Sequence, residues 1–395
     1  MITSPGSRYS PARVVMMIDS LLAGGAERVA VELAIGLDRE RFLPHVLVTR
    51  GSGPLRRLLD EAGVPYTILD RARRFDYGAW RAARKLVAQA DIIHSHKFGS
   101  NVWGALLSRR TGVPLIAHEH NFAAESSTFR ALVDRHIIAP AASRIVCVAD
   151  SVRDVELSMG IAEHKLVTVP NGAHLEAALD RDDARAELGL ELDADTFIVG
   201  IVGRLRPEKA HDVALTAMAH LARAGVDAQL CIVGDGPCES DLRALARNRG
   251  VNDRIIWAGE RRDAARLAGA FDAALVCSRW EGMPLAALEA MAAGVPLIAT
   301  RVGALPSLVA QGRGIAVDVA DDRAIAAAIA DLASDEPRRQ ALGGAGREHV
   351  RNEYSFDRMV RRVEALYIAV LAAEAEAAVS QNFDSYHFDE REEAA

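Results

Sequence analysis

The sequence has no run of apolar residues long enough to cross a membrane, since a spanning helix needs about 20 of them in succession. The polar segment Met1 to Arg13 also lacks the apolar stretch of a secretory signal peptide. These two absences predict a soluble, cytoplasmic protein. They leave open a peripheral contact with the inner face of the cell membrane.

Cysteines and aromatic residues are scarce. The four cysteines, Cys147, Cys231, Cys238 and Cys277, form no C-x-x-C pair, so neither a disulfide framework nor a structural zinc site is indicated. Three of them lie in apolar, strand-like runs, which predicts buried thiols in a reducing compartment. Aromatic residues make up 5% of the chain, and short apolar runs alternate with alanine-rich segments, which favours layered α/β domains.

Most of the chain also lacks an excess of charge of either sign. The formal net charge is −7, and residues 373–395 alone carry seven acidic residues against one arginine. The rest of the chain is therefore near neutral, which gives no case for binding nucleic acid. The acidic segment itself is expected to be disordered.

Apolar runs alternate with helical patterns through the first half. The run Val14 to Ile18 is typical of a central strand, and Gly24 and Gly25 separate it from a helical pattern, Ala26 to Leu37. This alternation predicts a doubly wound parallel sheet, whose ligands bind beyond the C-terminal ends of the strands. Two adjacent glycines alone favour a plain tight turn, although their N–H groups can also contact a ligand.

Two pairs of histidines follow successive predicted strands. His94 and His96 lie in D-I-I-H-S-H, and His118 and His120 lie in H-E-H-N. Four imidazoles at one edge of a sheet could suggest a metal site. No acidic cluster accompanies them, however, so we predict that no metal binds there.

The second half begins with the apolar run Phe197 to Val202, which is followed by G-R-L-R-P-E-K. Arg204 and Lys209 are therefore expected at the C-terminal end of a parallel strand. An arginine supplies a forked donor and a lysine a compact charge, a combination that suits a diphosphate. Surface cations on a loop are the common alternative.

Two other strings resemble ligand motifs without fitting them. Gly234 and Gly236 could suggest a dinucleotide fingerprint, but position 239 is a glutamate and the preceding strand is not the first of its domain. The one D-x-D string, Asp193 and Asp195, precedes a predicted strand instead of ending one. We therefore predict neither NAD binding nor a metal at that string.

The segment Ser278 to Thr300 reads as a helix between two buried strands. Pro284 suits the first helical position and Gly294 the C-terminal cap. Glu289 is the one charged residue of this alanine-rich helix. Burying a lone carboxylate costs several kcal/mol, so we expect a definite partner, either an arginine of a neighbouring strand or ligand hydroxyls at the helix start.

Glu281 and Glu289, within E-G-M-P-L-x-x-L-E-A-M-A-A-G-V-P, resemble the E-x7-E signature of retaining glycosyltransferases of family 4, also called group 1 glycosyl transferases. The strings G-G-A-E-R, D-I-I-H-S-H, H-E-H-N, V-P-N-G, G-R-L-x-x-E-K and V-G-D-G-P are similar to further motifs of this family. They occur in family order over about residues 13–372.

The resemblance implies the GT-B fold, an α/β architecture of two Rossmann-like, doubly wound parallel-sheet domains with a C-terminal crossover helix. We accordingly expect an acceptor-side domain at 1–175, a donor-binding domain at 176–354, a crossover helix at 355–372 and an acidic tail at 373–395.

The implied activity is transfer of a hexosyl unit from a nucleotide-diphosphate sugar to a glycan or lipid-linked acceptor, in surface polysaccharide or glycoconjugate synthesis. The anomeric configuration is retained, and neither a metal nor another cofactor is required. The alternatives are a non-catalytic nucleotide-sugar-binding subunit or sensor, and an epimerase or phosphorylase of the same architecture.

The resemblance also implies a set of site residues. Arg204 and Lys209 would bind the diphosphate, and Glu289 the ribose hydroxyls. Glu281 and the N–H groups of Gly282 and Met283 would bind the hexose. The residues implied to catalyse or to bind the donor are Glu281, His120, Arg204, Lys209, Gly282, Met283, Leu285, Glu289 and Gly234, with Gly24 and Gly25 in an acceptor or phosphate loop. His118 is the alternative to His120 as the histidine that faces the sugar.

A basic segment surrounds Trp80 in the first half. Its cations are Arg71, Arg73, Arg74, Arg81, Arg84 and Lys85. Such a run is usually a solvated helix face. Since the acceptor of such an enzyme can be lipid-linked, the segment could instead contact anionic headgroups.

Overall fold

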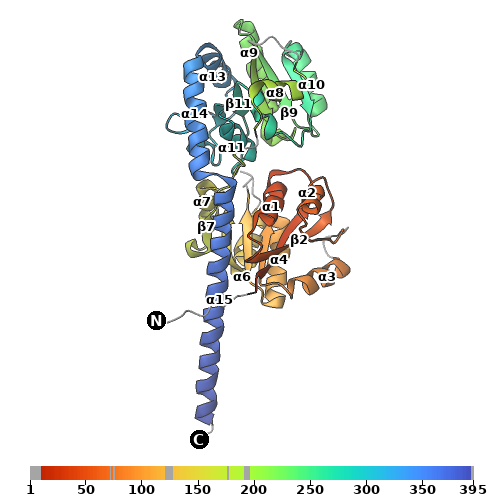
Figure 1. Cartoon of the computed structure of the whole chain (residues 1–395), viewed down its shortest axis with the longest axis vertical. Coiled ribbons are helices and arrows are strands. Elements are labelled where there is room, and N and C mark those ends of the chain that lie inside the picture. The colour runs from red at the N-terminus through yellow and green to blue at the C-terminus, as the bar shows by residue number, and fades with distance from the viewer. Residues whose placement is uncertain are drawn as a thin grey trace.

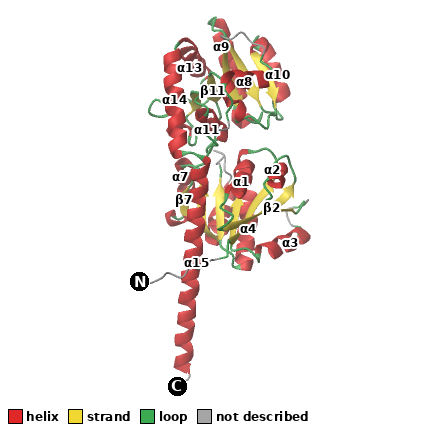
Figure 2. Cartoon of the chain, viewed as in Figure 1, coloured by secondary structure: helices red, strands yellow, loops and turns green. Residues whose placement is uncertain are grey.

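The structure is a computed structural model and describes residues 10–71, 73, 76–120, 128–175, 178–190 and 196–392. These residues form two α/β domains, one above the other along the long axis of the molecule (Figure 1). A long C-terminal helix runs along the first domain (Figure 1). Figure 2 shows helices on both faces of each sheet. No helix within the described ranges is both long and apolar enough to span a membrane.

The first domain is built on seven parallel strands in the order β3-β2-β1-β4-β5-β6-β7. The strands are β1 (Ala12–Ser20), β2 (Phe42–Gly51), β3 (Tyr66–Ile68), β4 (Ile92–His96), β5 (Leu115–Glu119), β6 (Ala142–Cys147) and β7 (Leu166–Thr168). The centre of β1 is buried on both faces, and the adjacent residues Met16 and Met17 enter two different cores. The buried strand predicted from the apolar run is thereby confirmed.

Helices connect these strands and cover both faces of the sheet. They are α1 (Gly25–Gly36), α2 (Arg56–Glu61), α3 (Tyr77–Val87), α4 (Lys97–Thr111), α5 (Thr128–Val133), the π-helical turn η1 (Asp134–Ile138), α6 (Ala139–Ala141), α7 (Asp150–Ser158) and the 3-10 turn η2 (Glu163–Lys165).

The second domain is built on six parallel strands in the order β10-β9-β8-β11-β12-β13. The strands are β8 (Phe197–Val202), β9 (Ala228–Val233), β10 (Ile255–Gly259), β11 (Ala273–Val276), β12 (Leu297–Thr300) and β13 (Gly314–Val317). Strand order reverses at β8 and β11 here and at β1 and β4 in the first domain, which are the switch points where such sheets bind ligands.

The second sheet carries helices on both faces as well. They are α8 (Arg181–Glu187), the 3-10 turn η3 (Pro207–Lys209), α9 (His211–Arg223), α10 (Glu239–Asn248), the 3-10 turns η4 (Asn252–Arg254) and η5 (Arg266–Ala270), α11 (Leu285–Ala292), α12 (Leu305–Val309), α13 (Asp322–Ser334) and α14 (Glu336–Glu353). The last helix of the chain is α15 (Phe356–Glu392).

Two chain segments cross between the domains side by side. The amide of Ala173 donates to the carbonyl of Tyr354 over 2.8 Å, and the amide of Phe356 donates to the carbonyl of Ala173 over 2.9 Å. A Cβ atom on Gly172 would lie 2.6 Å from the carbonyl oxygen of Ser355, so only glycine fits at this crossing. This glycine ends the V-P-N-G string that was predicted as the crossover into the second domain.

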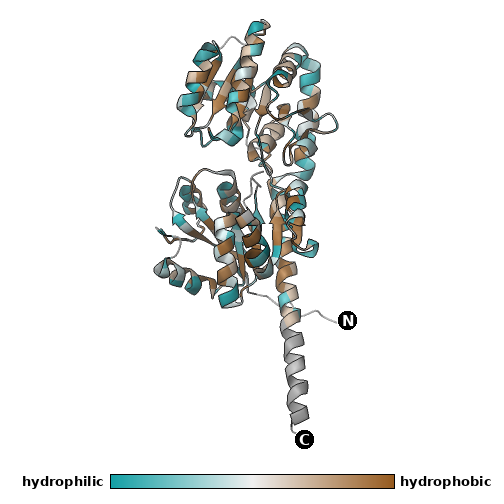
Figure 3. Ribbon diagram, turned by 180° about the vertical axis from the view of Figure 1, so that it is seen from behind, coloured by the Kyte–Doolittle hydropathy of each residue, from teal (hydrophilic) through white to brown (hydrophobic). Residues whose placement is uncertain are grey.

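Helix α15 returns to the first domain and completes its core. Met359, Val363 and Tyr367 are buried in the same cluster as residues of β1, β2 and α1. Figure 3 shows that the part of α15 beside the first domain is largely apolar, as are the strands. Tyr367 also bonds to a strand residue, because its hydroxyl lies 2.6 Å from His94 Nδ1.

The acidic tail was expected to be disordered, and this is wrong for residues 373–392, which continue α15 as helix. The alanines and glutamates that follow residue 372 have high intrinsic helix propensity, and the acidic charge outweighed this signal in the sequence interpretation. The last three residues lie outside the described part of the chain.

The cysteines are free thiols, and Cys147, Cys231 and Cys277 are buried, as predicted from their apolar surroundings. Burial raises the pKa of each of these three thiols. They are therefore protonated at neutral pH and unreactive.

Candidate active site

The lysine and the first glutamate of the predicted site form an ion pair. Lys209 lies in η3 after β8, Glu281 lies in the loop between β11 and α11, and Lys209 Nζ contacts Glu281 Oε1. Ser278 Oγ donates to the same oxygen over 2.7 Å. The carbonyl of Ser278 in turn accepts from Thr300 Oγ1 over 2.7 Å. Two residues that stand 72 positions apart are thus held together at the C-terminal ends of β8 and β11.

Arg204 lies in the same loop as Lys209 and is exposed. In the part of the chain that the structure describes, no hydrogen bond or ion pair involves its side chain. Backbone bonds hold this loop to the end of β9 and to the loop after it, since Gly203 N donates to Val233 O over 2.9 Å and Leu205 N to Asp235 O over 2.7 Å. The backbone of Arg204 is therefore held in place, while its exposed guanidinium can bind an anion.

Gly234 is needed where these two loops meet. Its φ is +143°, and a Cβ atom would lie 2.1 Å from the carbonyl oxygen of Gly203. A side chain at this position would push the two loops apart.

Helix α11 begins one residue later than predicted. Pro284 is its N-cap, not its first helical residue, because its ψ is 127° and therefore extended. Gly294 has a φ of +80° just after the C-cap residue Ala293, which matches its predicted place at the C-terminal end. Met283 and Leu285, both predicted to touch the donor, are buried at the helix start.

Gly282 lies at the contact between the domains. A Cβ atom on it would lie 1.9 Å from the carbonyl oxygen of His120, which follows β5 in the first domain. Gly303, with a φ of +55°, packs against the same turn, since a Cβ atom on it would lie 2.3 Å from Glu281 O. Ala304 N donates to Gly282 O over 2.8 Å. His120 and the loop of Glu281, which the resemblance places at the sugar, are thereby brought together.

Glu289 has the definite partner that its burial required, but the partner differs from the expected one. Arg28 Nη1 donates to Glu289 Oε1 over 2.5 Å. The arginine comes from α1 of the other domain and not from a neighbouring strand. Burial raises the pKa of Glu289, and the positive charge of Arg28 opposes that rise. The sequence contains Arg28 within G-G-A-E-R, yet nothing local in that string indicates this contact.

The predicted glycine loop caps α1. Gly24 is the N-cap, Gly25 is the first helical residue, and a Cβ atom on Gly24 would lie 2.2 Å from Glu27 Oε2. Glu27 is buried and accepts a bond of 2.6 Å from Lys97 Nζ. Lys97 has a φ of +71°, a costly backbone conformation for a side chain with a Cβ atom. Sequence reasoning missed both Glu27 and Lys97, since a positive φ at a lysine has no sequence signal.

The four histidines form two hydrogen-bonded pairs between β4 and β5. His94 Nε2 lies 3.2 Å from His118 Nδ1, and His96 Nδ1 lies 3.0 Å from His120 Nε2. Three of the rings are fully buried, and His120 alone is partly exposed. Burial lowers the pKa of all four imidazoles, so they are neutral at pH 7.

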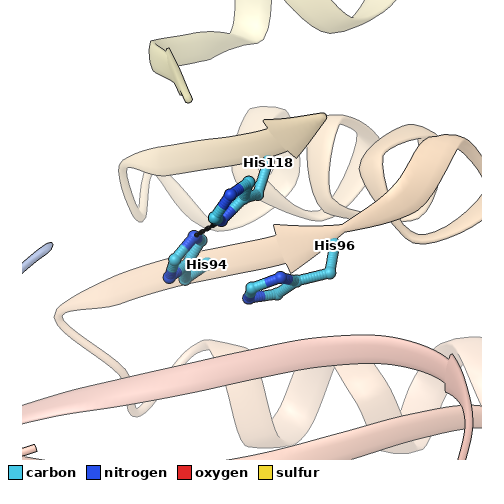
Figure 4. A group of neighbouring side chains, drawn as sticks. All are labelled: His94, His96 and His118. Carbon is cyan, nitrogen blue, oxygen red and sulfur yellow. Dashed lines mark hydrogen bonds between the residues drawn. The ribbon is translucent and has the colours of Figure 1, made fainter. Parts of the chain in front are cut away.

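Three of these histidines form the group best suited to hold a metal ion among the described residues. Nitrogen atoms of His94, His96 and His118 lie within 4.8 Å of one another (Figure 4). His94, however, uses both of its nitrogens in hydrogen bonds, one to Tyr367 and one to His118. A metal would have to replace these bonds. Asp193 and Asp195, the other residues considered for a metal, lie outside the described residues.

Glu119, Asp134 and Glu156 form a buried acidic cluster. Glu119 lies on the face of β5 opposite to that of His118. Arg130 Nη2 donates to Glu119 Oε2 over 2.9 Å, and Arg130 Nε lies 3.5 Å from Asp134 Oδ2. Burial raises the pKa of Glu119 to about 7, that of Asp134 to about 6 and that of Glu156 to about 9. Separate segments supply these groups, so their meeting could not be predicted from spacing.

The basic segment divides into a buried and an exposed part. Arg71 is buried, and its guanidinium lies 4.4 Å from the ring centre of Trp103. Arg81, Arg84 and Lys85 are exposed on α3, and Arg73 is exposed before it. Arg74 lies outside the described residues. Arg71 therefore belongs to the fold and not to the exposed basic face.

Two family models match the chain. The model described as Glycosyltransferase Family 4 matches residues 23–177. The model described as Glycosyl transferases group 1 matches residues 180–349. The two matches include the glycine loop, both histidine pairs and the Glu281–Lys209 pair.

Similar proteins include the UDP-Gal:alpha-D-GlcNAc-diphosphoundecaprenol alpha-1,3-galactosyltransferase of Escherichia coli, at 26% identity over 92% of this chain and 98% of that protein. The D-inositol 3-phosphate glycosyltransferase of Actinosynnema mirum is 33% identical over 74% of this chain and 76% of its own length.

Solved structures share the architecture. HepE of Anabaena in complex with UDP-glucose matches with a TM-score of 0.82 and 20% identity, over 91% of this chain and all of that chain. Sucrose-phosphate synthase from Thermosynechococcus elongatus matches with a TM-score of 0.76 and 22% identity, over 92% of this chain and all of that chain. At such identities the likeness concerns the fold, and it confirms the predicted GT-B architecture.

Proposed function

Because the chain belongs to the group 1 glycosyl transferases of family 4, we propose that it moves a hexosyl unit from a nucleotide-diphosphate sugar to a glycan or lipid-linked acceptor. The observation that carries this proposal is the ion pair of Lys209 with Glu281, with the exposed Arg204 in the same loop as Lys209. Two cations and one carboxylate at the C-terminal ends of β8 and β11 suit a diphosphate joined to a sugar.

A UDP-hexose is the first donor to test. The Escherichia coli relative is named for UDP-Gal, and the HepE structure contains UDP-glucose. Both relatives described above are also named for acceptors that carry phosphate. These names support a phosphate-bearing acceptor for this chain.

Catalysis in this proposal is mainly electrostatic. Arg204 and Lys209 stabilise the negative charge that develops on the diphosphate as its bond to the sugar C1 breaks. Removal of one such preorganised partner typically lowers the rate by about 10²–10³. Glu281 and the N–H groups of Gly282 and Met283 hold the hexose, and His120 lies against it.

Retention follows if the acceptor attacks from the face that the diphosphate leaves. The acceptor oxygen bonds to C1, the bond between C1 and the diphosphate oxygen breaks, and the acceptor proton passes to that oxygen. Mass spectrometry of the protein during turnover tests this route. A covalent glycosyl adduct on Glu281 would contradict it.

We further propose that the reaction needs no metal. Arg204 and Lys209 support this proposal, because two positively charged side chains can neutralise the charge on the leaving diphosphate as a metal ion otherwise would. Turnover in the presence of a chelator should equal turnover without it. A loss of activity that added divalent metal restores would overturn this proposal.

The exposed basic face of α3 supports a peripheral contact with an anionic membrane. Arg81, Arg84 and Lys85 stand three and four residues apart, so they share one side of the helix. A lipid-linked acceptor would bring such a face to the headgroups at the inner side of the cell membrane.

The proposed function is tested with a panel of UDP-, GDP- and ADP-linked sugars. One donor should raise the melting temperature of the wild type but not that of Glu289→Ala or Lys209→Ala, and product should form only with acceptor present. Donor binding without turnover on any acceptor would favour a sensor subunit instead. A new product without acceptor would favour an epimerase.

A further inference from the structure

An ion pair joins the two domains at the second glutamate of the E-x7-E segment. Arg28 stands in the first turn of α1, directly after the glycine loop, and Glu289 stands in α11, 261 positions later. Arg28 Nη1 lies 2.5 Å from Glu289 Oε1. Among the described residues, no other side chain forms a hydrogen bond with this carboxylate.

The first domain holds Arg28 in place independently of Glu289. Arg28 Nε donates to Glu32 Oε1 one turn further along α1, over 2.6 Å. Glu32 Oε2 also lies 3.7 Å from Nε2 of His174, in the segment that crosses between the domains. The guanidinium is therefore oriented before it meets the second domain, which distinguishes it from a surface arginine that finds a partner by chance.

The burial of Glu289 makes this partner necessary. Its side chain is only 7% exposed, and removing one partner of a buried pair is strongly destabilising, since a buried charge is left uncompensated. Arg28 occupies Oε1 alone, which leaves Oε2 to accept hydrogen bonds from a ligand.

Resting on the proposed function and on the ribose hydroxyls that the family resemblance implies as ligands of Glu289, we infer that Arg28 is a positioning residue for the ribose. It keeps the Glu289 carboxylate charged and aimed at the two hydroxyls. Since Arg28 and Glu289 belong to different domains, recognition of the ribose is complete only when the domains are closed.

The test compares UDP with 2′,3′-dideoxy-UDP, which lacks both ribose hydroxyls. Isothermal titration gives the Kd of each nucleotide for the wild type, Arg28→Gln and Arg28→Lys. Wild type should prefer UDP, Arg28→Gln should reduce that preference about tenfold, and Arg28→Lys should retain part of it. Both variants should bind the dideoxy nucleotide nearly as well as wild type does, because the diphosphate partners are untouched.

Two controls separate this role from a structural one. Arg57→Gln removes the same charge and an exposed ion pair with Glu61 on α2, and it should leave both affinities unchanged. In a Glu289→Gln background, Arg28→Gln should cause no further loss of preference, since the two residues act as a unit. Melting temperatures show whether each variant is folded.

Each contrary outcome has its own meaning. Failure of the wild type to bind any nucleoside diphosphate would remove the proposed function, and this inference with it. A wild type that binds UDP and dideoxy-UDP equally would show that Glu289 does not bind the ribose. An unchanged preference in Arg28→Gln, or tighter binding of UDP, would leave the proposed function intact and overturn the role of Arg28.

Discussion

Gly282 of the second domain rests against the carbonyl oxygen of His120 in the first, with room for no Cβ atom between them. The sequence suggested that both residues touch the sugar, and the structure adds that they touch each other. The loop that carries Glu281 thus reaches the backbone of the first domain at this point, and the Asn171 side chain also donates to Met283 O over 2.8 Å. We expect closure of the two domains to depend on this glycine.

A methyl group at this contact should therefore prevent closure without unfolding either domain. We expect Gly282→Ala to lower kcat/KM at least about tenfold, because misplacement by 1 Å is enough for a loss of that size or more. Its melting temperature should change little. The measurement is initial rate against donor concentration.

Gly344→Ala in α14 is the matched control, since a Cβ atom there would meet nothing within 4 Å. It should be fully active and slightly more stable, because alanine favours helix over glycine. Equal activity in both variants would show that the contact with His120 does not matter for catalysis.

Lys209→Ala tests the role of Lys209 in binding the diphosphate. The ammonium faces Glu281 and is partly exposed, so its loss should lower kcat by about 10²–10³. The melting temperature should fall as well, because Glu281, whose side chain is 8% exposed, loses its ion-pair partner. Steady-state rates and a thermal melt of the same sample measure both.

Arg206→Ala provides the comparison within the same loop. Arg206 is exposed, and it carries the same charge as Lys209. We expect nearly wild-type rates from it. A similar loss in both variants would indicate a general charge effect, not a clamp formed by Lys209.

The buried acidic cluster predicts that stability depends on pH. Glu156 ordinarily titrates near 4.5, and burial raises its pKa to about 9 in the folded protein. Between these values the folded protein holds a proton that the unfolded chain releases, so the free energy of unfolding falls as pH rises from about 5 to 9.

Glu156→Gln should weaken this dependence, because an amide cannot lose the proton. Relative to wild type, the variant should gain at least about 1 kcal/mol in free energy of unfolding at pH 8 compared with pH 5. Urea titrations at the two pH values provide the measurement. The exposed Glu348→Gln is the control, and it should keep the wild-type slope.

Removal of the exposed charges on α3 should weaken binding to anionic vesicles. The triple change of Arg81, Arg84 and Lys85 to alanine removes about 3 kcal/mol of attraction, at about 1 kcal/mol for each cation near the surface. Co-sedimentation with phosphatidylserine vesicles measures it, and neutral vesicles should capture neither protein.

The control for α3 changes three exposed arginines of the second domain to alanine. They are Arg223, Arg247 and Arg249. Both triple variants lose three positive charges. A difference in vesicle binding between them would therefore come from the position of the charges on α3. If the α3 triple sediments like the wild type, the membrane proposal is wrong.

The sequence predicted the elements whose signals are local. Strands such as β1 and β8 are continuous apolar runs because both of their faces are buried, and their positions were predicted from this alone. The helix with Glu289 was placed to within one residue, since Gly294 marks its end. The GT-B architecture came from the order of the motifs.

Contacts between distant segments had no such signal. The need of Glu289 for a partner could be predicted from its burial, yet the partner proved to be Arg28 of the other domain. The strained Lys97 and the meeting of Glu119 with Glu156 depend on how strands and helices are brought together. The tail was misjudged because its acidic charge was weighed without its helix propensity.

The return of α15 has a consequence for how this protein is made. The helix that covers β1, bonds His94 through Tyr367 and packs Phe356 against Gly36 is translated after the whole second domain. The first domain thus emerges from the ribosome first and acquires its full core last. A chain whose synthesis stops before Phe356 should expose that apolar surface, which makes unfinished copies recognisable to chaperones and proteases.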